Sequence, residues 1–252
     1  MQVEPSWRLA LTLTVLVILG AAVARAARLP VSRALIAAAV RATIQLAAVS
    51  GLVVLAIQRL WSAGLFVLAM FAIAVATTSG RVGTRRVWWW SALALASGML
   101  PVLAVIFWSR AVPFNGYSLI PIGSIIIGNA MTAHTLAGRR CFAALRENLG
   151  VYEATLAVGL PRKRAIWMVL EPVAAEALIP SLDSTRTVGL VTLPGAFIGV
   201  LLGGGTPLQA GAAQLLVLIG LVVAQIGTVT VFNQLVAAAQ LLPEDLHARL
   251  RP

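Results

Sequence analysis

The sequence predicts an all-α polytopic membrane protein with about seven transmembrane helices and one cytoplasmic helix-turn-helix. Two observations predict this class. Of the 252 residues, 60% are hydrophobic and 11% are charged, whereas a soluble domain carries about a quarter charged residues. The hydrophobic residues also form runs near the ~20 residues that a helix needs to cross a bilayer. Because lipid allows only helices or closed barrels, and barrel strands are shorter, these runs predict helices.

Seven hydrophobic runs follow one another along the chain without an intervening soluble domain. We therefore expect a single transmembrane domain over residues 1–252, with the lipid bilayer as its surroundings. The runs lie near residues 7–24, 35–58, 62–80, 88–109, 117–137, 177–201 and 209–239.

The basic residues indicate how the spans are oriented. The chain carries 19 Lys and Arg and 8 Asp and Glu, a net charge of +11, which in a soluble protein would favour a nucleic-acid partner. Here the basic residues cluster after alternate spans with few aromatics among them, so no nucleic acid is expected. Because Lys and Arg favour the cytoplasmic side, the N-terminus is predicted outside and the C-terminus in the cytoplasm. The clusters are Arg25, Arg28 and Arg33; Arg81, Arg85 and Arg86; Arg139, Arg140, Arg146, Arg162, Lys163 and Arg164; and Arg249 and Arg251.

One segment between spans, at about 139–172, carries a helical pattern of its own. Its Glu153-Ala154-Thr155, followed by Gly159 and later by Glu171-Pro172, resembles the EAA loop of ABC-transporter permeases. The resemblance implies a helix-turn-helix that docks on an ATPase, with small residues that allow close approach and a carboxylate that meets a basic or amide group. The alternative is a basic amphipathic connector between two spans. The expected coupling residues are Glu153, Ala154, Thr155, Gly159 and Arg162.

Polar residues inside three spans are unfavourable in lipid. A charge at mid-span costs about 2.5–3.5 kcal/mol on insertion scales, so Arg41 is expected either to face protein or water or to snorkel to the interface. Gln45 shares its helix face, four residues away. Asp183 and Arg186 are spaced to pair, either as a structural ion pair or within a translocation path. The predicted shared polar cavity is lined by Arg41, Gln45, Asn129, Asp183 and Arg186.

Proline and small residues mark breaks and close contacts. Pro194-Gly195 is predicted to interrupt the sixth span near its outer end as a gate or hinge, because proline frees backbone groups that need new partners. His134 is expected at the membrane interface. Small residues in the fifth span suit close contact between helices: Gly123, Gly128 and Ala130.

The sequence shows no catalytic arrangement. A phosphate-binding loop of the form G-x-x-x-x-G-K-[ST] is absent, since the single lysine, Lys163, is followed by Arg164. The lone Cys141 forms no internal disulfide, and with His134 and His247 it gives no metal-ligand spacing. A nucleophile paired with a base is also missing. We expect a transport subunit rather than an enzyme, with no catalytic residue, metal site or cofactor of its own.

Taken together, these motifs resemble the FetB-type ABC transporter permeases, a family of bacterial iron exporters and plant aluminium-tolerance permeases. The resemblance implies the permease subunit of an ABC exporter in the bacterial plasma membrane. It also implies a homodimer and a separate cytoplasmic ATPase that binds ATP and Mg. The matching segments are Arg41–Leu46, Gly128–Met131, the EAA-like segment, Val188–Gly199 and Gly203–Gln214.

The substrate class stays open between a metal ion such as iron and another small solute. Bacterial iron exporters of the family tend to carry methionines after the Pro-Gly, whereas Ala196 and Phe197 follow it here. The alternative from another class is an ATP-independent membrane protein. It would be either a secondary carrier that uses Asp183 and Arg186 for proton coupling or a lipid-modifying enzyme.

Overall fold

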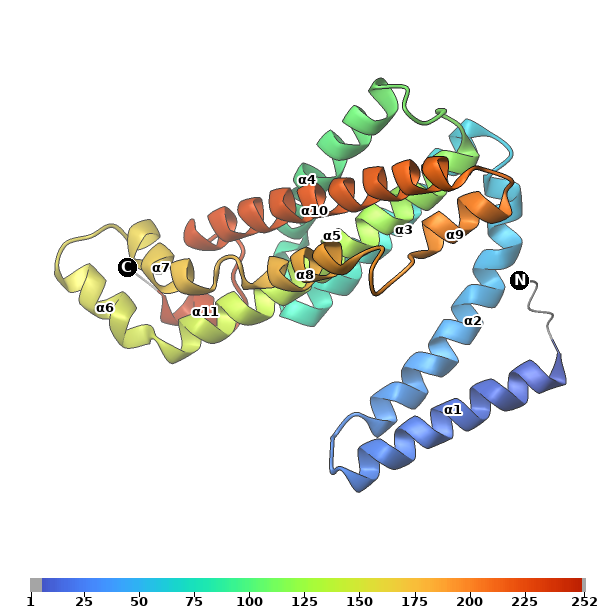
Figure 1. Cartoon of the computed structure of the whole chain (residues 1–252). Coiled ribbons are helices and arrows are strands. Elements are labelled where there is room, and N and C mark those ends of the chain that lie inside the picture. The colour runs from blue at the N-terminus through green and yellow to red at the C-terminus, as the bar shows by residue number, and fades with distance from the viewer. Residues whose placement is uncertain (1–5, 251–252) are drawn as a thin grey trace. The chain divides into compact units, whose positions relative to one another are not determined.

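The computed structural model describes residues 6–250 and consists of helices joined by short turns (Figure 1). Seven helical segments are long and apolar enough to cross a membrane, so the chain is a polytopic all-α membrane protein, as predicted. The α-helices are α1 Trp7–Ala26, α2 Ser32–Ala56, α3 Leu60–Val82, α4 Trp88–Trp108, α5 Gly116–Glu147, α6 Leu149–Ala157, α7 Arg162–Leu170, α8 Ile179–Thr187, α9 Gly195–Leu202, α10 Pro207–Ala237 and α11 Glu244–Arg249.

The first 58 residues form one of two compact units. Within it, α1 and α2 make a helical hairpin, and the turn between them places Arg28 in the left-handed region at φ 53°. Nearly all side chains of this hairpin are exposed. Because those side chains are largely apolar, lipid or protein must cover them.

The second unit, residues 59–252, is built on the packing of α3, α4, α5 and α10. Glycines allow the closest approaches. A Cβ atom added to Gly227 of α10 would lie 2.9 Å from the Cα of Gly98 on α4, so the two backbones nearly touch. On α5, Gly123 packs against Val67 of α3. The predicted close contacts at Gly123 and Ala130 are confirmed, whereas Gly128 faces open space.

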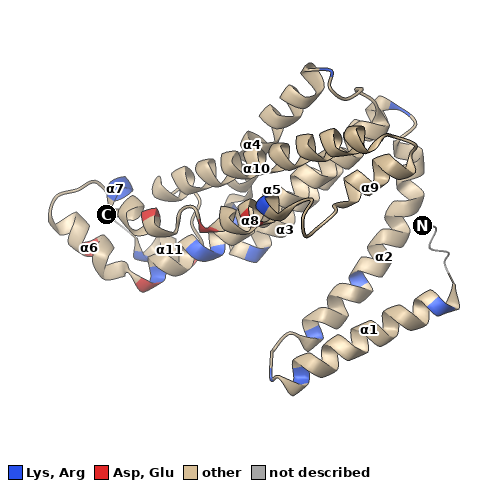
Figure 2. Cartoon of the chain, viewed as in Figure 1, with Lys and Arg blue, Asp and Glu red and all other residues tan. Residues whose placement is uncertain are grey.

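The two longest helices reach beyond the thickness of a bilayer. α5 has 32 residues and α10 has 31, which correspond to ~45–48 Å at 1.5 Å per residue, against ~30 Å of hydrocarbon. Their C-terminal ends pack with α6, α7 and α11 around a core that includes Phe142, Ile166, Leu170, Phe232 and Leu246. Charged residues of the second unit gather around this end (Figure 2). We call it the basic end.

Local sequence signals explain where these long helices begin. The side chain of Asn115 accepts a hydrogen bond from the amide of Ser118 at the start of α5, at 3.0 Å. At the start of α10, Thr206 and Gln209 form a reciprocal capping box, with Pro207 as the first helical residue. Both devices satisfy amides that have no partner inside the helix.

The span expected over 177–201 is interrupted, as predicted at Pro194-Gly195, and the break reaches back to Val188. The chain runs from α7 through two short 3-10 turns, Glu171–Val173 and Glu176–Leu178, into α8, which ends at Thr187. A turn at residues 188–192 follows before α9 begins at Gly195. The helical segment that meets the length and hydropathy of a span is Arg162–Thr187.

Candidate functional site

The predicted helix-turn-helix is present as α6 and α7, joined by residues 158–161. Gly159 lies in the left-handed region at φ 85°. Its amide donates to the carbonyl of Leu156 at 2.9 Å, and the amide of Leu160 donates to the carbonyl of Thr155 at 3.3 Å. This bond pair is a Schellman motif, in which glycine is favoured because a side chain strains the left-handed conformation. The glycine of the EAA-like pattern therefore has a structural reason within the chain.

The two faces of α6 differ in character. Tyr152 and Thr155 are buried, and the Thr155 hydroxyl donates to the carbonyl of Val151 at 2.6 Å. Glu153 and Ala154 lie on the exposed face. We call this exposed side, residues 150, 151, 153, 154, 157 and 158, the outer face of α6. It combines small residues with the exposed apolar side chains of Val151 and Val158.

The inner face of α6 is anchored to the C-terminal part of the chain. The Tyr152 hydroxyl donates to the carbonyl of Leu250 at 3.3 Å. α11 is itself held by two ion pairs: Arg86 with Glu244 at 2.8 Å, and Arg146 with Asp245 at 2.7 Å. The hydrogen bond from Arg146 holds the pKa of Asp245 below its usual range. α11 thus links α6 to α5 and to the turn between α3 and α4.

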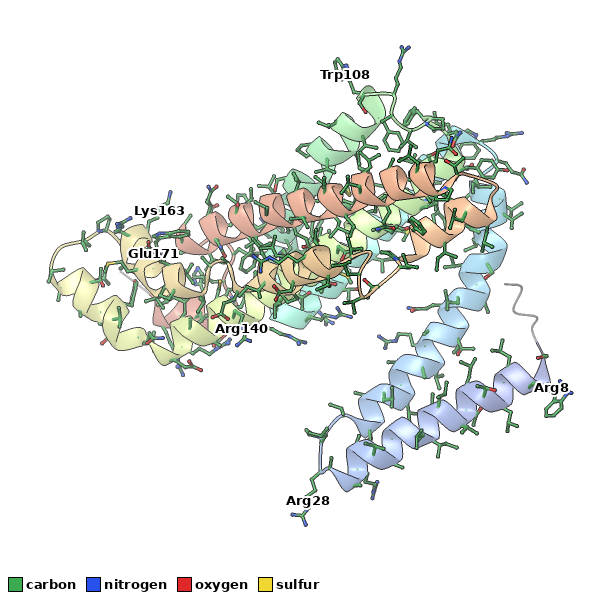
Figure 3. All side chains as sticks on the ribbon, viewed as in Figure 1. Arg8, Arg28, Trp108, Arg140, Lys163 and Glu171 are labelled. Atoms are coloured by element: carbon green, nitrogen blue, oxygen red, sulfur yellow. The ribbon has the colours of Figure 1, made fainter. Side chains whose placement is uncertain are left out.

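α7 has a buried side and a charged side. Ala165, Ile166, Val169 and Leu170 are buried in the core of the basic end. On the other side Lys163 is exposed and projects outward (Figure 3), and Glu171, directly after the helix, is exposed as well. Arg162, predicted to take part in coupling, opens α7, and its buried Nε finds no hydrogen-bond partner among the described residues.

α5 and α10 are tied to the connection after α7 by one buried amide. Asn233 of α10 donates from Nδ2 to the carbonyl of Ala174 at 3.1 Å. Its Oδ1 accepts a hydrogen bond from the Sγ of Cys141 on α5 at 3.4 Å. Arg140 of α5 reaches the same connection through an ion pair with Glu176 at 3.2 Å. The helix-turn-helix therefore stands on a platform joined to both long helices.

The predicted pairing of Asp183 and Arg186 is confirmed on α8, where Arg186 Nη1 lies 3.2 Å from Asp183 Oδ1. Both side chains are largely exposed, at 60% and 76%. Arg41 and Gln45 are exposed on α2, in the first unit. A polar cavity shared by these four residues and Asn129 remains a prediction.

The segment between α8 and α9 has a compact backbone of its own. Gly189, at φ 82°, donates its amide to the carbonyl of Thr192 at 2.9 Å, and an isolated bridge joins Val188 and Thr192. Pro194 then stands immediately before the first residue of α9, where its missing amide costs nothing. The Pro194-Gly195 pair lies at the expected interruption. Its role as a gate or hinge stays a prediction.

Asn129, which is also predicted to line the polar cavity, lies on α5. Its side-chain Nδ2 donates to the carbonyl of Ile125 at 2.8 Å within the same helix. Its backbone carbonyl accepts from Nε2 of Gln225 on α10 at 3.3 Å. The Oε1 of Gln225 is buried without a partner among the described residues. At this level of the helices the amide that bridges α5 and α10 is therefore that of Gln225, a residue that the sequence pattern did not indicate.

His134 is fully buried between helices, which corrects its expected place at the membrane interface. The Thr135 hydroxyl donates to the Met131 carbonyl at 2.8 Å, so its oxygen accepts the proton of Thr78, 2.9 Å away. Thr78 must then accept from Nδ1–H of His134, also at 2.9 Å. This order leaves Nε2 as a bare acceptor that has no partner in the described chain. No local pattern indicates this network, because Thr78 lies 56 positions before His134 along the chain.

Residues 7–240 match the sequence model of the family described as "Uncharacterised protein family (UPF0014)". The chain belongs to this family. The match includes the α6–α7 segment and the α8–α9 break and ends before α11. The resemblance to FetB-type permeases is confirmed, since the similar proteins include relatives of that kind.

Three relatives illustrate the family. The chain is 31% identical over 128 residues to the UPF0014 membrane protein STAR2 of Oryza sativa subsp. japonica, covering 51% of this chain and 45% of that protein. It is 31% identical over 126 residues to Protein ALUMINUM SENSITIVE 3 of Arabidopsis thaliana, covering 50% and 46%. It is 33% identical over 127 residues to the probable iron export permease protein FetB of Escherichia coli (strain K12), covering 50% and 49%.

These alignments are partial, and the chain spans about half the length of the curated relatives it matches. No solved structure shows a significant match.

Proposed function

We propose that this UPF0014 protein is the permease subunit of an ABC transporter and exports a metal ion such as iron or another small solute. The observation that carries the proposal is the outer face of α6. It presents Glu153 and Ala154 on a helix-turn-helix that stands at the basic end. A face of small and apolar residues beside a carboxylate suits a protein partner that approaches closely.

The partner in this proposal is a separate ATPase that binds ATP and Mg, and it docks on the outer face of α6. The basic end is then cytoplasmic, in agreement with the preference of Lys and Arg for that side. Two copies of the permease assemble with two ATPase subunits. The inner face of α6 transmits movements of the ATPase to the permease, because Tyr152 and α11 join it to α5 and to the turn after α3.

The similarity to the probable iron export permease of Escherichia coli supports a metal ion as the substrate. Ala196 and Phe197 supply no sulfur ligand to α9, so oxygen and nitrogen groups would handle the substrate. The ion pair of Asp183 and Arg186 on the interrupted sixth segment favours a second candidate, a proton-coupled carrier that needs no ATPase.

Co-purification and ATPase stimulation test the proposal. The permease is expressed together with a candidate ABC ATPase subunit from the same organism, and the complex is reconstituted in vesicles. We expect Ala154→Trp to abolish both association and stimulation, because the indole would obstruct the outer face of α6. The matched control is Ala69→Trp, which changes an exposed alanine on α3 and should leave both readouts intact.

Two results would overturn the assignment. Normal ATPase stimulation by the Ala154→Trp variant would show that α6 is not part of the interface. Substrate transport driven by a proton gradient in vesicles without any ATPase would favour the carrier.

A further inference from the structure

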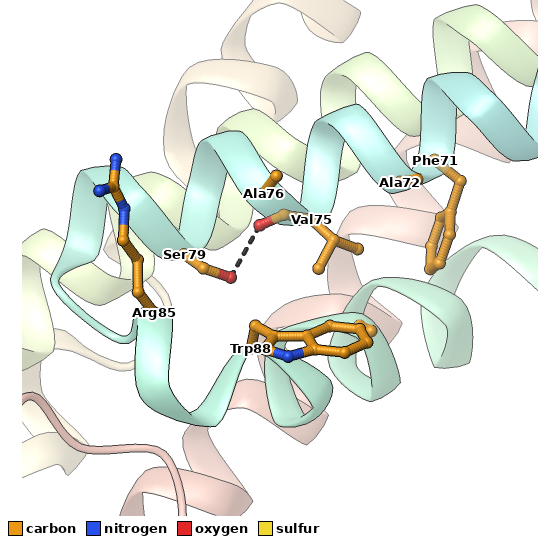
Figure 4. A pocket seen from close by; sticks show the side chains of 8 residues that line it. Phe71, Ala72, Val75, Ala76, Ser79, Arg85 and Trp88 are labelled. Atoms are coloured by element: carbon orange, nitrogen blue, oxygen red, sulfur yellow. Dashed lines mark hydrogen bonds between the residues drawn. The ribbon is translucent and has the colours of Figure 1, made fainter.

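A cavity of about 610 Å³ lies between α3 and α4 at the basic end. Figure 4 shows Phe71, Val75 and Ala76 along α3, Trp88 at the start of α4, and Arg85 in the turn that joins the helices. Phe71 and Arg85 lie at opposite ends of the row (Figure 4). The cavity is independent of α6 and of the predicted transport residues.

The cavity has an apolar wall and one charged end. The hydroxyl of Ser79, its polar group on α3, donates to the carbonyl of Val75 at 2.7 Å and is already satisfied. The charged group is the guanidinium of Arg85. A ligand that fits must therefore be apolar over most of its length and anionic at one end.

Arg85 is positioned but has no carboxylate partner. Its guanidinium lies against Gly80, where an added Cβ would be 3.1 Å from Nε and 3.2 Å from Nη2. The neighbouring Arg86 instead pairs with Glu244 at 2.8 Å. No ion pair of Arg85 occurs between residues 6 and 250. Two adjacent arginines thus differ in one respect: one charge is neutralised and the other is available.

The dimensions match one leaflet of a bilayer. From Phe71 to Ser79 the apolar row rises ~12 Å at 1.5 Å per residue, and a leaflet has ~15 Å of hydrocarbon. α3 ends at Val82, so a bilayer crossed by α3 would place the polar headgroups beside Arg85. Trp88 lies at the same boundary, which tryptophan favours in membrane proteins. Basic pockets between helices at this depth bind lipid headgroups.

We propose that this cavity binds one phospholipid. One of its two acyl chains lies along Phe71, Val75 and Ala76, and its phosphate accepts hydrogen bonds from Arg85. Lipids with a net negative charge bind more tightly than zwitterionic lipids of the same chain length, because Arg85 has no other counter-ion.

The charge is tested with Arg85→Gln and the matched control Arg86→Gln. Purified full-length protein in mild detergent is titrated with phosphatidylglycerol or phosphatidylcholine, and the thermal unfolding midpoint is followed. We expect phosphatidylglycerol to stabilise the natural protein and Arg86→Gln at the same concentrations. Arg85→Gln should need about tenfold more lipid, the loss expected for one charge-assisted hydrogen bond. Equal weakening in both variants would overturn the proposal, because it would mean a general effect of surface charge.

The apolar wall is tested with Ala76→Phe, which fills the cavity while Arg85 stays in place. The control is Ile73→Phe, at an exposed position of α3 outside the cavity. Native mass spectrometry should show one retained phospholipid in the natural protein and the control, and none in Ala76→Phe. Inorganic phosphate is the second probe. If it stabilises the protein as well as phosphatidylglycerol does, or if Ala76→Phe keeps its lipid, the site is not a phospholipid site.

Discussion

Single glycines set how closely the helices of the second unit approach one another. Gly98 of α4 faces the carbonyl of Ala224 and the side chain of Thr228 on α10, with no room for another atom. We expect Gly98→Ala to destabilise the protein by about 2 kcal/mol, since overpacking of a tight contact costs ~1–3 kcal/mol. The measurement is the thermal unfolding midpoint in detergent.

The control for this substitution is Gly211→Ala on α10, where an added methyl meets nothing within 4 Å. Its midpoint should stay the same or rise, because alanine is a better helix former than glycine. If both variants behave alike, the α4–α10 contact is looser than described.

At the scale of elements, the turn between α6 and α7 depends on a left-handed residue. We expect Gly159→Leu to raise amide hydrogen exchange in α6 and α7, because the left-handed conformation costs roughly 1–2 kcal/mol for a residue with a Cβ. Gly159→Asn should have a much smaller effect, since asparagine tolerates this region.

These two variants separate turn geometry from the bulk of the side chain at the proposed ATPase interface. Leucine disturbs both, whereas asparagine adds a side chain and largely keeps the turn. A similar rise in exchange for both variants would contradict the role assigned to the left-handed turn.

The broken sixth segment carries the second prediction at this scale. Because the Asp183–Arg186 pair is largely exposed, it contributes at most about 1 kcal/mol to stability. We expect Asp183→Asn, Arg186→Gln and the double variant to keep the yield of folded protein and basal ATPase activity but lose transport. Ser184→Ala, at a neighbouring exposed position, is the control. Transport restored in the double variant would identify the pair as structural.

At the scale of the whole molecule, the orientation in the membrane is open to a direct measurement. Cys141 is the single cysteine of the chain and is buried, so Cys141→Ala provides a simple background. Single cysteines at Glu147 and Lys163 should label from the cytoplasm, and those at Ala111 and Leu208 from the opposite side. The physical reason is the gathering of basic residues at one end, which favours the cytoplasm.

The homodimer is tested on the same background by chemical crosslinking in native membranes. We expect a product of twice the mass of the chain, with and without the ATPase. Labelling of Lys163 from outside would overturn the orientation, and the recovery of monomers alone would overturn the dimer.

The sequence by itself determined the features that depend on composition and on near neighbours. Lipid requires long apolar helices, so the run lengths predicted seven spans. The resemblance of residues 153–172 to the EAA loop implied the helix-turn-helix, and the glycine at position 159 suits its turn because a turn needs only local conformational freedom. The spacing of Asp183 and Arg186 likewise predicted their ion pair.

Tertiary structure alone decided which side of each helix is covered. His134 is buried because residues far along the chain, Thr78 and Phe232, pack on it, and no local pattern distinguishes such a face from an exposed one. The same reason explains why Gly98 rather than Gly128 forms a close contact. The Pro194-Gly195 pair predicted the interruption before α9, whereas the end of the preceding helix at Thr187 was decided by the folded backbone, in which Gly189 is left-handed and Val188 bridges to Thr192.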